Sequence, residues 1–280
     1  MPRLIINADD LGFAPGVNRG IIETHLAGSL SSASMMVNTP AFHEAASLVR
    51  DTALTLGVGL HLNLIVGLPL GQVPTLADPR TGQFYSLAEL ARRAATGRVS
   101  LRDVKRECDA QLQALAIDGI ACTHIDSHRH THALPGILPA VLASAREAGV
   151  RVVRRPLDKP TLGNPAAAAK MLVLRASWYA ALRGVPPADR DIVAASPAFR
   201  GIAMQGAADV QEQLLTILDE LPHGTTEIMM HPGYDDVVLA LQDPYRKERE
   251  REVAALCSAP VLARLRRGDI ELVTFAHLPS

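Results

Sequence analysis

The strongest constraint on the fold is the alternation of short apolar runs with longer segments of helical periodicity. Eight runs have the length and residue content of strands, and they cover about Arg3–Ala8, Ser32–Asn38, Leu56–Leu62, Gly119–Asp126, Arg151–Arg155, Asp191–Ala195, Thr225–His231 and Asp269–Phe275. Strands that alternate with helices form parallel β/α units, so the chain is predicted to be an α/β protein. Eight units suit a distorted (β/α) TIM-like barrel. The alternative is an open doubly wound sheet, although no G-x-G-x-x-G follows the first strand.

Residues that commonly cap helices mark the segments between these strands. Ser86 lies three residues before Glu89, the spacing of a capping box, and Ser100 precedes another helical segment. Further helices are predicted over about Pro40–Arg50, Pro135–Ala148, Pro165–Arg183, Ala208–Leu221 and Tyr245–Arg267. No repeat or linker divides the chain, and a (β/α) barrel commonly takes about 250 residues. We therefore expect residues 1–280 to form a single domain.

Charge, cysteine content and hydropathy exclude several functional classes. Lys and Arg number 28 against 29 Asp and Glu, so no net basic field attracts nucleic acid or an anionic membrane. The three cysteines share no CxxC spacing, which indicates a reducing compartment rather than a disulfide framework. No apolar stretch approaches the ~20 residues of a membrane span, and the N-terminus lacks a signal-peptide pattern. We expect a cytoplasmic protein.

An acidic pair ends the first predicted strand. The apolar run Leu4-Ile5-Ile6 leads into Asn7-Ala-Asp9-Asp10. In a parallel barrel the carboxyl ends of the strands form the mouth where active sites lie. Adjacent carboxylates can act there as a metal ligand and a general base, although a polar loop or a helix cap explains this motif alone equally well.

A second polar pair ends the third predicted strand. His61 and Asn63 are two residues apart and share one face of an extended chain, while leucines occupy the other face. A lone histidine in such a strand is more often a hydrogen-bonded core residue than a ligand. The position at a strand end favours a functional interpretation if partners converge on it.

The third motif is a histidine-rich run after the fourth predicted strand. Within Thr123–His132, one face of period two carries the residues His124, Asp126, His128, His130 and His132. Neutral imidazoles and a carboxylate are ligands that a divalent cation takes at a catalytic site. Asp126 could instead orient a histidine ring, and a solvated loop accounts equally well for His130 and His132. The cluster is expected to converge with Asp10 and His61.

Together these motifs resemble a known family. The segments LIINADDLGF, GLHLNL, THIDSHRHTH and EIMMHPGYDD are similar, in this order, to motifs of the YdjC-like carbohydrate deacetylases, which include chitin-oligosaccharide and hopanoid-associated deacetylases. The resemblance implies a distorted (β/α) barrel with one divalent metal ion held by Asp10, His61 and His128. It also implies Asp9 as general base and His231 as candidate general acid.

The same resemblance implies Mg²⁺ as the metal and a homodimer, whereas the nitrogen and oxygen ligands would favour Zn²⁺ on affinity. These residues suit hydrolysis of an N-acetyl group on an amino sugar, because a divalent cation activates water and polarises the amide carbonyl. Asp9 could accept the water's proton, and His231 could protonate the departing amine. No G-x-S-x-G motif points to a serine nucleophile.

Substrate contacts are predicted from residues near these motifs, namely Phe13, Asn63, Asp126, His130 and Tyr234. Phe13, Tyr85 and Tyr234 are candidates for stacking on a sugar ring, and Trp178 and Tyr179 are expected in the core. The segment Leu157–Gly206 matches no motif and leaves the sugar unidentified.

Two other functions remain open from the residues alone. A phosphoester hydrolase would need two metal ions ~3.5–4 Å apart and a fixed cation, for which Arg154 or Arg155 could serve. A non-enzymatic metal- or sugar-binding protein would not need Asp9 beside a complete ligand set.

Overall fold

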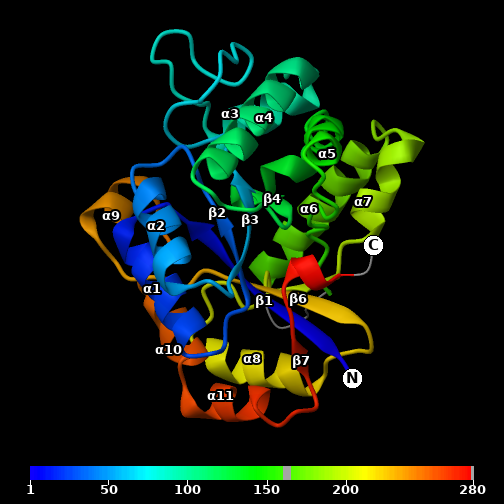
Figure 1. Cartoon of the computed structure of the whole chain (residues 1–280). Helices are drawn as coiled ribbons and strands as arrows, with labels where there is room; N and C mark the ends of the chain where they lie inside the picture. The colour runs from blue at the N-terminus through cyan, green and yellow to red at the C-terminus, as the bar shows by residue number, and fades with distance from the viewer. Residues whose placement is uncertain (160–164, 279–280) are drawn as a thin grey trace.

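The central sheet is parallel throughout (Figure 1). A computed structural model describes residues 1–159 and 165–278. The strands in these residues are β1 Arg3–Leu11, β2 Ser32–Met35, β3 Gly57–Leu62, β4 Ile125–Ser127, β5 Ala198–Arg200, β6 Thr225–Met230 and β7 Glu271–Leu272. Their order is β4-β3-β2-β1-β6-β5, and β7 pairs with the start of β1. Strand β1 therefore lies between β2 and β6.

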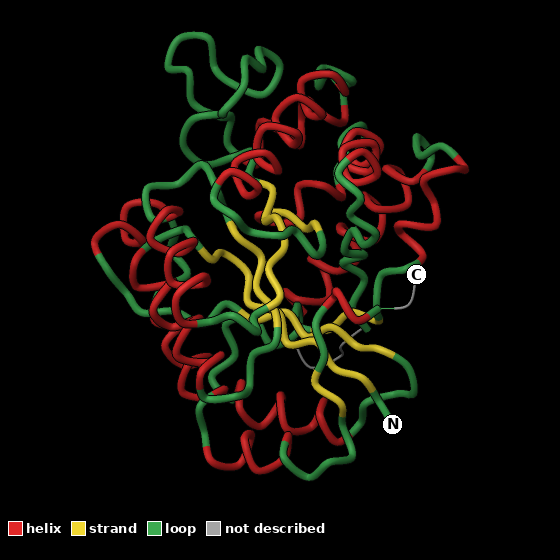
Figure 2. Tube along the Cα trace, viewed as in Figure 1, coloured by secondary structure: helices red, strands yellow, loops and turns green. Residues whose placement is uncertain are grey.

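Helices surround the sheet on its outer side (Figure 2). They are α1 Pro15–Leu26, α2 Phe42–Thr52, α3 Leu87–Ala95, α4 Leu101–Ile117, α5 Leu138–Glu147, α6 Pro165–Leu182, α7 Arg190–Ala194, α8 Val210–Asp219, α9 Val237–Gln242, α10 Lys247–Leu256 and α11 Ala259–Leu265. Short 3₁₀ helices cover η1 His128–Ala133, η2 Pro187–Asp189 and η3 Phe275–His277. Within the described residues, no helix combines the length and apolarity that a membrane-spanning segment requires.

The sheet curls into a half-barrel that does not close within the described residues. The strand predicted over Arg151–Arg155 contributes one bridge, from Val153 to Ile125. The strand predicted over Asp191–Ala195 is wrong, because this segment forms α7, and β5 lies a few residues later. A short apolar run does not distinguish a strand from a buried turn of helix. The fold is thus a single α/β domain with a curled parallel sheet.

Two helix predictions are also corrected. The expected single helix over Tyr245–Arg267 is broken in two, because Ser258 caps α11 by accepting a hydrogen bond from the Val261 N–H at 3.4 Å. Helix α1 was not predicted from the sequence. Gly20 is required there by packing: a Cβ at this position would lie 2.6 Å from the Cα of Gly233. This close approach places α1 against the segment that follows β6.

The core follows the predicted strands. Of the two helical residues expected in the core, Trp178 and Tyr179, only one is buried. Trp178 is buried in α6, as predicted. Tyr179 is 52% exposed, so its prediction as a core residue is wrong. Neighbouring positions on a helix point about 100° apart, and only one of the two faces α5 and η1.

Candidate active site

Both carboxylates of the acidic pair face the same cavity because β1 bulges where they lie. The pairing of β1 with β2 shifts register between Ala8 and Leu11, which leaves one extra residue on β1. Asp10 adopts a left-handed backbone conformation with φ of 73°. Successive residues of a regular strand point to opposite faces, and a bulge re-aims one of them. Asp9 and Asp10 are each 2% exposed and both line the cavity.

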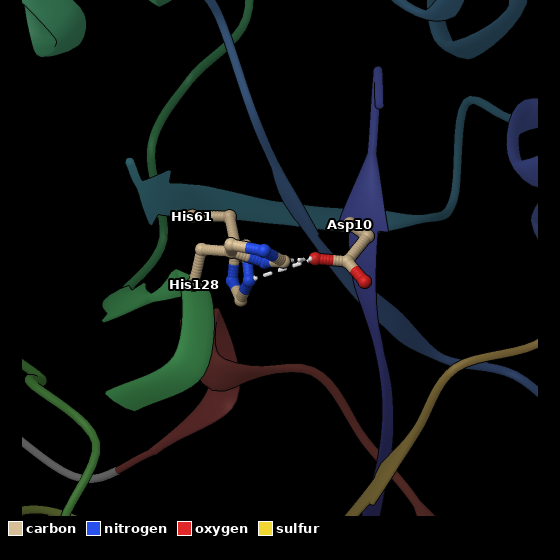
Figure 3. Close-up of side chains that lie close together, drawn as sticks. All are labelled: Asp10, His61 and His128. Carbon is tan, nitrogen blue, oxygen red and sulfur yellow. Dashed lines mark hydrogen bonds and ion pairs between the residues drawn. The ribbon is translucent and has the colours of Figure 1, made fainter. Parts of the chain in front are cut away.

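Asp10, His61 and His128 converge at the carboxyl ends of three strands (Figure 3). His61 Nε2 lies 3.1 Å and His128 Nδ1 lies 2.8 Å from the same oxygen, Oδ1 of Asp10. One ligand atom from each residue lies within 4.8 Å of the others, and all three side chains are buried. The predicted convergence is confirmed. Two imidazole nitrogens and a carboxylate oxygen form a donor set that suits a divalent cation with open positions.

Asp126 lies behind His61 rather than in the cavity. Its Oδ1 accepts a hydrogen bond from His61 Nδ1 at 2.7 Å, which directs Nε2 of the ring toward Asp10. Burial alone would lower the pKa of His61, but the Asp126 and Asp10 carboxylates outweigh it and raise that pKa to about 10. Asp126 therefore fixes the orientation of His61, the role that carboxylates often have behind metal-binding histidines.

Asp9 is held by a buried arginine. Arg154 Nη1 donates to Asp9 Oδ2 and Arg154 Nη2 to Asp9 Oδ1, both at 2.7 Å. The same guanidinium contacts Asp126 Oδ2 at 2.7 Å and Glu227 Oε1 at 2.6 Å. Burial alone would raise the pKa of Asp9, but Arg154 outweighs it and holds that pKa well below its usual range. Burial raises the pKa of Glu227 to about 7.

His231 ends β6 beside Asp9. Its Nε2 lies 4.0 Å from Asp9 Oδ2, and its backbone N–H donates to Glu252 Oε2 at 2.5 Å. Burial lowers the pKa of His231 to about 4, despite the neighbouring carboxylates of Asp9 and Asp10. The ring is therefore neutral near pH 7 in the metal-free protein.

The histidine-rich run does not continue as a strand, so its expected period-two face does not form. The chain turns at η1, where Arg129 and His130 both have φ of 55°. With Asp10 they are the only non-glycine residues at positive φ in the described chain, and all three line the cavity. Such strained conformations concentrate at functional sites. His132 is turned into the core, where its Nε2 lies 3.0 Å from the Arg154 carbonyl.

The cavity has a volume of about 560 Å³ and opens at the carboxyl ends of the strands. It is lined by the predicted residues Asp9, Asp10, His61, His128, His130 and His231. His130 is 7% exposed, and its Nδ1 has no hydrogen-bond partner within the described structure. A buried polar atom of this kind beside a cavity is suited to a ligand.

None of the other predicted substrate contacts lines the cavity. Phe13 and Asn63 are fully buried, and Asn63 is used within its own turn, where its Oδ1 accepts from the Val66 N–H at 3.0 Å. Tyr234 points away from the cavity: its hydroxyl donates to Glu23 Oε2 at 2.7 Å, and Arg19 lies over its ring. Tyr85 lies instead against Arg93. Proximity to a motif in sequence did not place these rings at the site.

Several cavity residues were not predicted, and most come from segments without a recognisable motif. They are Lys170 in α6, Gln205 and Gly206 after β5, Asp243 and Tyr245 before α10, and Arg249 within it. Arg249 Nη2 lies 2.6 Å from Asp10 Oδ2 and 3.2 Å from Asp243 Oδ2. Its guanidinium is buried and reaches Asp10 from α10, a helix that packs against α1 and α8.

Comparison with known proteins places the chain among relatives of similar length. The sequence model of the family described as "YdjC-like protein" matches residues 3–267. A carbohydrate deacetylase of Brevibacillus brevis is 35% identical over 282 residues, covering 99% of each chain. A chitooligosaccharide deacetylase of Yersinia pestis is 31% identical, covering 97% of each chain.

A solved structure has the same fold. A putative cellobiose-phosphate cleavage protein of Enterococcus faecalis superimposes with a TM-score of 0.78 at 28% identity, covering 98% of this chain and 97% of that one. The curled sheet and its surrounding helices are thus shared over nearly the whole length.

Proposed function

This chain belongs to the YdjC-like protein family, and we propose that it is a metal-dependent hydrolase that removes an N-acetyl group from an amino sugar or a short N-acetylated oligosaccharide. One observation carries the proposal: a buried Asp-His-His set and a second carboxylate, Asp9, line the same cavity. The names of relatives that match the whole chain support a sugar amide as substrate.

The donor set fits one divalent cation, held by Asp10, His61 and His128. His61 Nε2 and His128 Nδ1 already point at Oδ1 of Asp10, so the three ligand atoms face one another where the cation would bind. When bound, the cation would polarise the amide carbonyl and lower the pKa of water. Mg²⁺ is proposed from the family and Zn²⁺ is favoured by the ligands.

Asp9 is proposed as the general base, acting through Oδ2. Its Oδ1 accepts hydrogen bonds from Asn7 at 3.0 Å and Ser34 at 3.3 Å as well as from Arg154. Its Oδ2 accepts from Arg154 and lies on the side of His231. Arg154 keeps Asp9 ionised and fixes its plane, which leaves one lone pair of Oδ2 for the proton of the attacking water.

His231 is proposed to deliver a proton to the departing amine. Because the ring is neutral near pH 7, it must first receive the proton that it donates. Asp9 Oδ2, 4.0 Å from His231 Nε2, is positioned to supply it through a small movement or a bridging water. His130, whose Nδ1 has no hydrogen-bond partner among the described residues, is proposed to contact the substrate.

Arg154 does not fit the role that a phosphoester hydrolase would give it. This guanidinium is fully buried among Asp9, Asp126 and Glu227 and does not line the cavity, so it is not placed to hold a phosphate. A second buried set, Asp9, His61 and Asp126, shares His61 with the first. Arg154 contacts both of its carboxylates, where a second cation would have to bind.

Further properties follow from the family and are proposed with it. We propose that residues 1–280 form one deacetylase domain and that the half-barrel is a distorted, opened TIM-like (β/α) barrel. We also propose a cytoplasmic location and a homodimer. Light scattering that gives a monomer mass at working concentration would contradict the dimer.

The test of the function is acetate release from a panel of N-acetylated mono- and oligosaccharides, with and without a chelator. Release that stops with chelator and returns with added Mg²⁺ or Zn²⁺ is expected. Release that is insensitive to chelator, or phosphate release from sugar phosphates in its place, would refute the assignment.

A further inference from the structure

Tyr245 is an immobilised aromatic wall of the cavity. It is the only phenylalanine, tyrosine or tryptophan among the described residues that line it. Its backbone N–H donates to Asp243 Oδ1 at 3.0 Å, and its carbonyl accepts from Arg249 Nε at 2.9 Å. Its hydroxyl accepts from the Gly206 N–H at 2.8 Å and donates to Glu252. Because the hydroxyl is used within the protein, the ring itself is what Tyr245 offers to a ligand.

The same wall continues into polar groups. Gly206, which binds the Tyr245 hydroxyl, follows Gln205, and Gln205 Oε1 accepts a hydrogen bond from Lys170 Nζ at 2.5 Å. All four residues line the cavity. An ammonium has three N–H donors, so Lys170 keeps donors for a ligand beside the amide of Gln205.

An apolar ring next to fixed donors is complementary to a pyranose, which has C–H faces and hydroxyl edges. We propose that Tyr245, Lys170 and Gln205 form a sugar subsite: a pyranose ring packs its C–H face on Tyr245, and its hydroxyls bind Lys170 and Gln205. The inference rests on the proposed function, which it deepens by assigning sugar recognition to the segments that no motif covers.

The subsite is adjacent to the reacting groups without overlapping them. The Tyr245 and His231 ring centroids lie 5.6 Å apart, and His231 Nε2 lies 4.0 Å from Asp9 Oδ2. The His231 ring thus lies next to both Tyr245 and Asp9. Tyr245 and Lys170 should therefore determine affinity for the sugar rather than the rate of the chemical step.

The experiment compares Tyr245→Leu, Tyr245→Phe and Lys170→Met with the wild type and with Tyr179→Leu, a control at an exposed tyrosine outside the cavity. Binding of N,N′-diacetylchitobiose to chelator-treated protein is measured by calorimetry, so that no turnover is required. Loss of the aromatic ring in Tyr245→Leu should weaken binding about 10-fold. Tyr245→Phe and Tyr179→Leu should bind within about 2-fold of wild type, and Lys170→Met should bind more weakly than wild type.

Acetate release then separates affinity from chemistry. For Tyr245→Leu, KM for the disaccharide should rise while kcat changes little. Unchanged binding in Tyr245→Leu and Lys170→Met would overturn the subsite, as would a loss confined to kcat. If Tyr245→Leu does not fold, binding by Lys170→Met tests the subsite in its place, because the exposed Lys170 side chain does not pack in the core. Disaccharide binding that depends on Tyr245 without acetate release from the metal-loaded wild type would refute the deacetylase function and keep the subsite.

Discussion

The two Nη nitrogens of Arg154 each lie 2.7 Å from a different carboxylate oxygen of Asp9, so the proposed base is held by a bidentate ion pair. A bidentate pair fixes both the charge and the plane of a carboxylate. The partner of the base thus comes from the segment after β4, 145 residues away in the sequence.

Asp9→Asn and Asp10→Asn should separate the base from the ligand. Asp9→Asn is expected to keep the metal and to lose about 10²–10⁴-fold in turnover, because the attacking water loses its proton acceptor. Asp10→Asn should lose the metal first, and excess metal should partly restore activity. Metal content and acetate release are measured on the same samples. Loss of metal in Asp9→Asn with retention in Asp10→Asn would reverse the two roles.

Arg154→Met should destabilise the protein by about 3–5 kcal/mol, because three buried carboxylates lose their shared cation. Urea unfolding measures this change. Arg92→Met, which removes an exposed ion pair with Glu89 in α3, is the matched control and should unfold like the wild type. Equal stability of both variants would show that Arg154 is not needed to balance the buried charges.

Metal binding should release about one proton and strengthen as the pH rises. Burial lowers the pKa of His61, but Asp126 and Asp10 raise it to about 10, so near pH 7 this ring carries a proton where the cation would bind. The cation must displace that proton, and its affinity should rise ~10-fold per pH unit below 10. Calorimetry in buffers of different ionisation enthalpy counts the protons. An affinity independent of pH between 6 and 8 would argue against His61 as a ligand.

Acid should destabilise the protein partly through His124. Burial against Phe275 lowers the pKa of His124 to about 3, whereas the unfolded chain keeps about 6.5. Between these values the unfolded state binds a proton that the native state does not, so stability falls as the pH falls below 6.5. Between pH 6 and 4, the free energy of unfolding of His124→Phe should fall by ~1.4 kcal/mol per pH unit less than that of the wild type. His223→Phe, at an exposed position, should keep the wild-type slope in urea unfolding.

Much of the fold and the metal set could be predicted from local patterns. β1, β3 and β6 lie where their apolar runs indicate, and Ser86 caps α3 by accepting from the Glu89 N–H at 3.4 Å. The family assignment from the four motifs is confirmed by the match over residues 3–267. The convergence of Asp10, His61 and His128 was predictable because parallel strands bring their carboxyl ends to one edge of a sheet.

The sequence by itself determined which side chains reach the strand ends, whereas only the tertiary structure decided how they face and what holds them. The bulge at Asp9–Asp10 turns both carboxylates into one cavity, and it is set by pairing with β2. Arg154 and Tyr245 reach the site from segments outside the motifs, because burial of charge and of aromatic surface depends on elements packed together in space. Local periodicity does not reveal such long-range contacts. For that reason the sequence did not show that Phe13 and Tyr234, which lie within the motifs, are outside the cavity.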